Sequence, residues 1–397
     1  MTGGGAAGAN LLALRSHNTA LVLDLLRAAG AEGISRLELA ERTGLTPQAV
    51  SKITARLREE GLAAEAGRRA STGGKPRTVL RLVPEAGHAV GVHVDRDELR
   101  AVLVDLNGSV AAERRRPLDL GAGAPAVVEA VAREVEELVG EVLWTTGRTG
   151  AGRFTGGWSG GSGAAALVGA ASLVGVDSLL GVGVALPGPL DHRLGVLHRV
   201  TGFPEWDGFP LRDALGRRLG VPVVVDKDTN AAALGLAVAG EGASFAYLHL
   251  GTGLGAGLVI EGAVHRGART GAGEFGHQVI QLDGPRCGCG DRGCIEALCL
   301  AAVGRGEVRE AARVLGAGAA NLAGLLDIDL VLLGGRTVAA APDEFVTGVA
   351  AVLDARARRE GAPEGAVPVR VAPGGARGVA EGAAQLLLAP LFGRGDG

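Results

Sequence analysis

The sequence predicts an α/β protein of two or three domains, and three observations lead to this prediction. Its 397 residues exceed the length of one ordinary domain. Hydrophobic residues make up 47% of the chain, which is enough for a large core. From Val90 onward, short runs rich in Val and Leu alternate with Ala-rich helical segments, which is typical of layered strands and helices.

The first 85 residues have a different pattern, which predicts a small helical domain. Apolar residues recur at helical spacing within residues 18–29. Ser35 and Glu38 have the spacing of a capping box, in which each side chain accepts a backbone N–H of the other residue. This box predicts the start of a second short helix, which Gly44 ends.

A third helix follows, and its polar face predicts contact with DNA. Thr46 can cap this helix, with Pro47 in the first helical position. Two short helices joined by a turn that contains glycine match a helix-turn-helix. Its outer face should carry Gln48, Ser51 and Lys52, side chains that can read base edges in a major groove. A plain three-helix bundle with a solvated polar face is the alternative.

A basic hairpin is predicted directly behind these helices. Strand candidates at Leu62–Glu65 and Thr78–Leu82 flank a connection that can touch phosphates or the minor groove. The basic residues of this predicted wing are Arg68, Arg69, Lys75 and Arg77. Residues 1–90 hold 12 Lys and Arg against 8 Asp and Glu, while the remainder holds 28 against 35. An excess of positive charge in residues 1–90, with an excess of negative charge in the remainder, is typical of a protein whose N-terminal domain binds an anion such as DNA.

Other features exclude a membrane or secreted protein. The chain contains no apolar run of membrane-spanning length, and its first ten residues lack the pattern of a secretory signal. We therefore expect a cytoplasmic protein. A Gly-rich stretch at residues 147–163 predicts an insert in the body.

The strongest chemical signal is a cluster of cysteines behind one histidine. All four cysteines lie between Cys287 and Cys299, and clustering of this kind favours metal binding over disulfides. Three thiolates and one imidazole form a closed tetrahedral zinc site, which serves structure because no position is left for a substrate. The predicted ligands are His277, Cys287, Cys289 and Cys294, and Cys299 is predicted to be a small buried residue.

These residues also bring the sequence close to a known family. G-E-F-G-H at residues 273–277, followed by C-x-C-G-x-x-G-C-x-E, resembles the ROK family of repressors, open reading frames and kinases. The resemblance spans roughly residues 15 to 390. Further matching segments are Thr72–Arg77, Leu186–Pro189, Pro204–Leu211, Asp226–Ala233, Gly251–Gly257 and Leu333–Gly335.

The resemblance implies an actin/hexokinase-like fold of two lobes with a sugar cleft between them. The implied division is a winged helix-turn-helix at 1–85, a first lobe at 86–226 completed by 378–397, and a second lobe with the zinc loop at 227–377. The implied sugar-binding residues are Asp228, Glu274, His277 and Glu296. Asp228 matches the general base of family kinases and is here a vestigial one.

One departure from the kinase pattern argues against catalysis. Family kinases carry a phosphate loop of the type D-x-G-G-T-K, whereas His93–Glu98 reads H-V-D-R-D-E. Asp95 and Asp97 would repel ATP, so we expect no ATP cofactor. Lys227 stands where family kinases have Asn, and it can pair with Asp228 or favour an acidic or phosphorylated sugar.

The sequence therefore predicts a repressor-type regulator that binds operator DNA and responds to a sugar or sugar phosphate. A homodimer or higher oligomer is expected, since helix-turn-helix readers bind two half-sites. Two alternatives stay open: an ATP-dependent sugar kinase that retains a DNA-binding head, and a constitutive regulator without a ligand.

Overall fold

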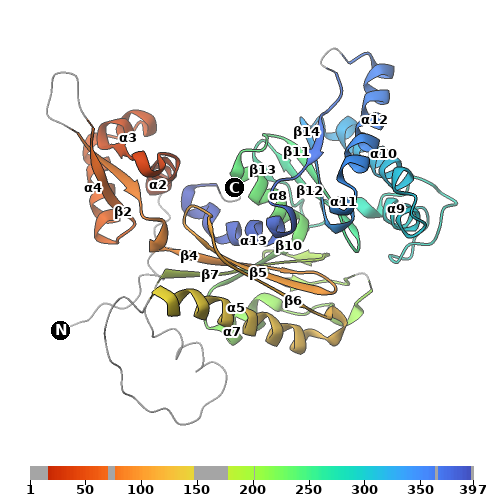
Figure 1. The fold of residues 1–397 in the computed structure, drawn as a ribbon, viewed down its shortest axis with the longest axis horizontal. Helices are drawn as coiled ribbons and strands as arrows, with labels where there is room; N and C mark the ends of the chain where they lie inside the picture. Colours follow the sequence, from red (N-terminus) through yellow and green to blue (C-terminus); the bar gives the residue numbers. More distant parts are fainter. Residues whose placement is uncertain (1–16, 70–76, 147–177, 201, 363–364, 395–397) are drawn as a thin grey trace, which may run out of the picture.

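The structure is a computed structural model, and it describes residues 17–69, 77–146, 178–200, 202–362 and 365–394. Figure 1 shows a small head of helices and a hairpin beside a larger body with two sheets. The Gly-rich stretch predicted as an insert at 147–163 lies outside the described residues.

The head contains three helices and a three-stranded antiparallel sheet in the order β1-β3-β2. The predicted capping box is present, because Ser35 accepts from Glu38 N and the Glu38 side chain accepts from Ser35 N. Thr46 caps the third helix as predicted. The elements are α2 (His17–Ala28), β1 (Ile34–Ser35), α3 (Arg36–Thr43), α4 (Pro47–Glu59), β2 (Ala63–Arg69) and β3 (Arg77–Leu82).

The first sheet of the body has five strands in the order β10-β7-β4-β5-β6. β10, β7 and β4 are parallel, and β5 and β6 add to them as an antiparallel meander. Helices α5 and α7 contribute to the apolar core on one face. The elements are β4 (His88–Val94), β5 (Glu98–Asp105), β6 (Val110–Pro117), α5 (Ala124–Thr146), β7 (Leu179–Leu186), α7 (Leu211–Leu219) and β10 (Val223–Lys227).

The second sheet has five strands in the order β13-β12-β11-β14-β15, with α9, α10 and α12 in the core on one face. Its strands are β11 (Phe245–Leu250), β12 (Leu254–Ile260), β13 (Ala263–Val264), β14 (Leu330–Gly334) and β15 (Val369–Val371). The helices of this part are α8 (Asp228–Ala239), α9 (Ile295–Gly304), α10 (Val308–Leu326), α11 (Arg336–Ala340) and α12 (Pro342–Glu360).

Two helices lie between the sheets and join the halves of the body. The C-terminal helix α13 (Gly378–Leu388) packs on β4 and β7, and it also contacts α8, which packs on β12. The approach is close: a Cβ atom at Gly91 of β4 would lie 1.9 Å from the Ala380 carbonyl oxygen. Glycine at this position therefore allows α13 to lie directly on the sheet.

The head is packed against the C-terminal end of the body rather than tethered by a linker alone. Buried side chains of α2, including Leu26, share one apolar cluster with Leu391 and Phe392. Asp24 pairs with Arg27 and with Arg394, each at 3.1 Å, and the Arg27 guanidinium lies 4.2 Å from the centre of the Phe392 ring. Figure 1 shows α4 on the side of the head away from the body.

The two strands predicted for the wing are present as β2 and β3, with ends that differ by up to four residues, whereas β6 is among the strands that were not predicted. Its segment carries Arg114, Arg115 and Arg116, and it forms the edge of the first sheet. Charged side chains are common on edge strands, where they prevent pairing with another sheet. Arg114 and Arg116 both pair with the buried Glu134 of α5, so tertiary ion pairs accompany the strand. No helix among the described residues is both long and apolar enough to cross a bilayer.

Candidate functional site

The four predicted metal ligands come together in one place. One nitrogen or sulfur atom from each of His277, Cys287, Cys289 and Cys294 lies within 4.8 Å of the other three. Cys287 Sγ is 3.6 Å from His277 Nδ1, and Cys289 Sγ is 3.7 Å from Cys294 Sγ. Bonds of about 2.3 Å to sulfur and about 2.0–2.1 Å to nitrogen around a tetrahedral ion would put such atoms about 3.6–3.8 Å apart. This cluster can therefore bind a metal ion.

The loop that carries the cysteines is shaped by close backbone contacts. A Cβ atom at Gly293, where φ is +69°, would lie 1.6 Å from the Gln281 carbonyl oxygen. Cys294 occupies the N-cap position of α9, and Ile295 N donates to the Gln278 carbonyl oxygen. Burial and the neighbouring thiols raise the pKa of Cys294 to about 12. Its thiol is thus protonated near neutral pH unless a cation replaces the proton.

A small pocket beside the cysteine loop gathers the residues implied to bind sugar. Asp228 is the first residue of α8, directly after β10. Glu274 is the N-cap of a single turn of 3-10 helix, and His277 is its last residue. Glu296 lies in the first turn of α9. All four residues line one pocket of about 80 Å³. Three separate segments of the chain therefore place carboxylates and an imidazole around one space.

Lys227 contacts a different carboxylate from the one considered in the sequence analysis. Its ammonium group donates to Glu274 Oε1 at 3.1 Å and also to the Ala272 carbonyl oxygen. No ion pair between Lys227 and Asp228 is present in the part of the chain that the structure describes. Lys227 is 2% exposed, so its charge is neutralised inside the protein, and it holds Glu274 at the edge of the pocket.

The other two carboxylates differ in how firmly they are held. Glu296 Oε2 accepts from Leu254 N at 2.8 Å, which leaves Oε1 near Cys287 Sγ at 3.9 Å. Asp228 Oδ1 accepts from Thr229 N at 2.7 Å and is in no ion pair among the described residues. Asp228 is consequently the carboxylate of this pocket with the greatest capacity left for a ligand hydroxyl.

The turn that replaces the kinase phosphate loop is held by an arginine from the second sheet. Arg336, at the start of α11, donates to both oxygens of Asp97 at 2.8 and 2.7 Å and to Asp95 at 3.2 Å. Thr252 Oγ1 donates to the other oxygen of Asp95 at 3.1 Å. The hydrogen bond from Arg336, followed by the charge of the same guanidinium, lowers the pKa of Asp97. We call Asp95, Asp97, Thr252 and Arg336 the latch, because it joins the two sheets. The two acids lie in the turn between β4 and β5 of the first sheet, while Thr252 lies between β11 and β12 of the second sheet and Arg336 follows β14.

The predicted DNA-binding face is exposed on α4. Gln48, Ser51 and Lys52 are all exposed, whereas Val50 and Leu57 of the same helix are fully buried. The helix therefore presents one polar and one apolar face, as the sequence predicts. In the wing, Arg77 is exposed at the start of β3 and Arg68 and Arg69 belong to β2, while Lys75 lies outside the described residues. DNA contact by these residues stays a prediction.

The sequence analysis did not predict two ion pairs at this site. Lys227 pairs with Glu274, and Arg336 pairs with Asp95 and Asp97. Arg336 follows L-G-G at the end of β14, and no spacing in the sequence relates it to Asp97, 239 residues earlier. The only sign of this in the sequence was that Asp95 and Asp97 stand where family kinases have Gly and Thr in their phosphate loop. Cys299 is buried, as predicted, and its thiol donates to the Ala311 carbonyl oxygen.

The fold and the site together define a class of protein: a two-lobed α/β body of the sugar-kinase type that carries a winged helix-turn-helix. Comparisons with known proteins agree with this class. The ROK family profile matches residues 165–306, and the winged helix-turn-helix DNA-binding profile matches residues 19–63. Over residues 165–306 the chain is thus similar to the ROK family.

Individual relatives include both regulators and kinases. The chain is 27% identical over 266 residues to the xylose repressor of Bacillus subtilis, which covers 66% of this chain and 61% of that protein. The structure of a ROK regulator homologous to the MLC protein of E. coli has a TM-score of 0.69 and 20% identity, covering 95% of this chain and 98% of that one. A ROK hexokinase from Thermus thermophilus has a TM-score of 0.54 and 28% identity, covering 75% and 96%.

Proposed function

We propose that this chain is a sugar-responsive transcriptional repressor. The observation that carries the proposal is the combination of a DNA-binding head, packed on the body, with a sugar-type pocket whose neighbouring phosphate loop is replaced by the latch. The proposed domain division is 1–85 for the head, 86–226 with 378–397 for the first lobe, and 227–377 for the second. Resemblance to the xylose repressor supports the proposal and makes xylose the first sugar to test.

The head would bind operator DNA through α4 and the wing. Helix-turn-helix readers place the second helix of the motif in the major groove, and the exposed residues of α4 have the matching polarity. Because such readers bind paired half-sites, we propose a homodimer on an inverted repeat. The proposed contacts are Gln48, Ser51, Lys52, Arg68, Arg69, Lys75 and Arg77.

A sugar or sugar phosphate would bind Asp228, Glu274, His277 and Glu296. The pocket measures about 80 Å³. The latch lies beside this pocket and joins the two lobes, because Asp95 and Thr252 line the pocket and also belong to the latch. A sugar that binds here would therefore be able to favour one arrangement of the lobes over another.

The His277 and cysteine cluster would hold a structural zinc ion. Its donor set is the closed Cys₃His type, and the distances from Cys287 Sγ to His277 Nδ1 and from Cys289 Sγ to Cys294 Sγ fit tetrahedral coordination. The ion would supply structural stability only. Through His277 and the start of α9, it would position Glu274 and Glu296 on either side of the pocket.

The proposed sugar response is tested by Asp228→Asn. This change keeps the shape of the side chain and the hydrogen bond from Thr229 N but removes the charge, so the sugar hydroxyl that binds this residue loses a charged acceptor. We expect about 10- to 100-fold more sugar to be needed for release of DNA, corresponding to about 1.5–3 kcal/mol. The measurement is a DNA-binding titration, using duplex DNA selected from a randomised pool by the full chain and a panel of pentoses, hexoses and their phosphates.

The matched control is Asp329→Asn, an exposed carboxylate at the opposite end of β14 from the latch. It should respond to sugar as the wild type does, and both variants should bind DNA normally without sugar. An unchanged response in Asp228→Asn would place the effector elsewhere. If no sugar affects the wild type, the constitutive regulator is the better description.

A sugar kinase with a DNA-binding head is the second candidate, and the likeness to the Thermus thermophilus hexokinase favours it. The latch argues against it, since two carboxylates and Arg336 occupy the turn where a phosphate loop would need backbone N–H groups. We expect no ADP release above background when the chain is incubated with ATP, magnesium and each sugar. Sustained release that depends on a sugar and disappears in Asp228→Asn would instead establish the kinase.

A further inference from the structure

One thiol of the cysteine cluster lies at the surface of the molecule. Cys289 is exposed, whereas Cys287 and Cys294 are buried. A cysteine that serves as a metal ligand is a thiolate, and the thiolate is the form that reacts with oxidants. Among thiolates, the exposed ones are oxidised first. Cys289 is therefore the sulfur of this cluster that a dissolved oxidant reaches most easily.

A second sulfur lies where it can react with an oxidised Cys289. Cys289 Sγ is 3.7 Å from Cys294 Sγ, and a disulfide bond would bring the two atoms to about 2.0 Å. The sulfur of Cys287 has other neighbours, because it lies 3.6 Å from His277 Nδ1 and 3.9 Å from Glu296 Oε1. The geometry therefore favours Cys294 as the disulfide partner of Cys289.

Hydrogen bonds of the loop itself hold the thiols close together. Cys287 N donates to the Asp291 carbonyl oxygen at 2.8 Å, and Gly290 N donates to the Cys287 carbonyl oxygen at 3.1 Å. Gly293 N donates to the Pro285 carbonyl oxygen at 2.9 Å, which closes the loop at its base. The thiols are thus brought together by local backbone structure, and a disulfide needs no movement of the lobes.

A disulfide in this loop would act on the neighbouring sugar pocket. It would remove two of the four ligands, and His277 with Cys287 alone cannot form a closed tetrahedral site. His277 lines the sugar pocket, as does Glu296 in the first turn of α9. Cys294 is the N-cap of the same helix. Oxidation of the thiols would therefore release the side chains that border the pocket.

We propose that Cys289 is an oxidative modification site, at which a peroxide joins Cys289 to Cys294 in a disulfide and the chain releases its metal ion. The Cys289 thiolate attacks one peroxide oxygen, the O–O bond breaks, and a sulfenic acid forms as hydroxide leaves. The Cys294 thiolate attacks the oxidised sulfur, the S–O bond breaks, and a second hydroxide leaves. The peroxide gains the two electrons that the sulfurs lose, and solvent protons neutralise both hydroxides.

The test treats the reduced, zinc-loaded full chain with hydrogen peroxide, without sugar or DNA. A chromogenic chelator should detect about one released zinc ion per chain. Peptide mass spectrometry should find a disulfide between Cys289 and Cys294, and a phosphine reductant with added zinc should reverse both changes. Cys299→Ser is the matched control, because Cys299 is buried outside the cluster, and it should behave like the wild type.

Cys289→His separates oxidation from metal binding. An imidazole can replace a thiolate as a zinc ligand but cannot form a disulfide, so this variant should bind zinc. Under peroxide it should release zinc at least about tenfold more slowly, because its remaining thiols in the cluster are buried. Release as fast as in the wild type would refute the role of Cys289. If the variant binds no zinc, the disulfide mapped in the wild type decides the question.

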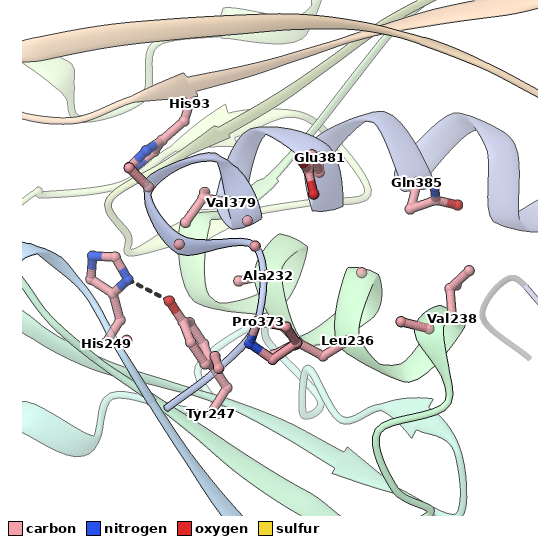
Figure 2. Close-up of a pocket in the computed structure, with 18 of the residues that line it drawn as sticks. His93, Ala232, Leu236, Val238, Tyr247, His249, Pro373, Val379, Glu381 and Gln385 are labelled. Carbon is pink, nitrogen blue, oxygen red and sulfur yellow. Dashed lines mark hydrogen bonds between the residues drawn. The ribbon is translucent and has the colours of Figure 1, made fainter. Parts of the chain in front are cut away.

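Tyr247, the only tyrosine of the chain, reports whether the change stays local. It is buried, and its hydroxyl group forms a hydrogen bond with His249 Nδ1 at 2.8 Å (Figure 2). Its second-derivative ultraviolet absorbance should remain that of a buried tyrosine after oxidation. A spectrum typical of exposed tyrosine would mean general unfolding and would overturn the proposal, as would retained zinc or a disulfide between other cysteines.

The effect of oxidation on the sugar response rests on the proposed repressor function, whereas formation of the disulfide does not. The oxidised chain should need at least about tenfold more sugar for release of DNA, because the pocket loses positioned side chains. If the disulfide forms and zinc is released while the sugar response stays unchanged, the modification site stands and its coupling to the pocket is refuted.

Discussion

Cys289→Ser is expected to release the bound metal and abolish the sugar response. Cys289 is exposed, so the substitution does not disturb core packing, and its effect should come from the loss of one thiolate ligand. Structural Cys and His zinc sites in small peptides contribute about 10–16 kcal/mol at pH 7. Removing a ligand should therefore disorder the loop that carries Cys287 and Cys294 and release the start of α9, where Glu296 lies.

The measurement is metal analysis after gel filtration in a weak chelator, followed by the sugar titration. We expect about one zinc ion per chain in the wild type, in line with a single site. Cys299→Ser is the matched control, because Cys299 belongs to the same segment but lies outside the cluster. It should retain the metal. Absence of zinc from the wild type, or full retention in Cys289→Ser, would contradict the assignment.

Lys52→Glu is expected to abolish specific DNA binding, with a loss of at least a hundredfold in affinity. Lys52 is exposed on the polar face of α4, so the fold should be unaffected. The change removes a cation and places a carboxylate against the phosphate backbone, where counterion release dominates affinity. Binding should be measured by fluorescence anisotropy at several salt concentrations, and wild-type affinity should fall steeply as salt rises.

Arg359→Glu provides the control for net charge. Arg359 is exposed in the last turn of α12, within the second lobe, and its reversal changes the total charge by the same amount. This variant should bind DNA like the wild type. If Lys52→Glu also binds normally, α4 does not enter the groove and the assignment of the DNA-binding face is wrong.

Local features of the fold were predictable because neighbouring residues determine them. The capping box of Ser35 and Glu38 and the cap at Thr46 depend on backbone groups within three residues. The polar face of α4 follows from helical periodicity in the same way. The ligand cluster was predictable for a related reason, since the three cysteines lie within eight residues and a short loop can bring them together.

Strand β6 could not be predicted from the local sequence pattern. Its three consecutive arginines carry no alternation of apolar and polar residues, so the segment does not read as a strand. In the folded chain, the strand pairs with β5, and Arg114 and Arg116 meet acids of α5. Long-range pairing and edge position outweigh local propensity here.

The sequence by itself determined the class of head, the His and Cys residues that cluster as candidate metal ligands, and the replacement of the kinase phosphate loop. Only the tertiary structure decided that Lys227 holds Glu274 and that Arg336 joins Asp95 and Asp97. The physical reason is distance along the chain. These ion pairs form between segments that the packing of α8 and α13 brings together. Because the paired residues are far apart in the sequence, the pattern of neighbouring residues does not predict which side chains will pair.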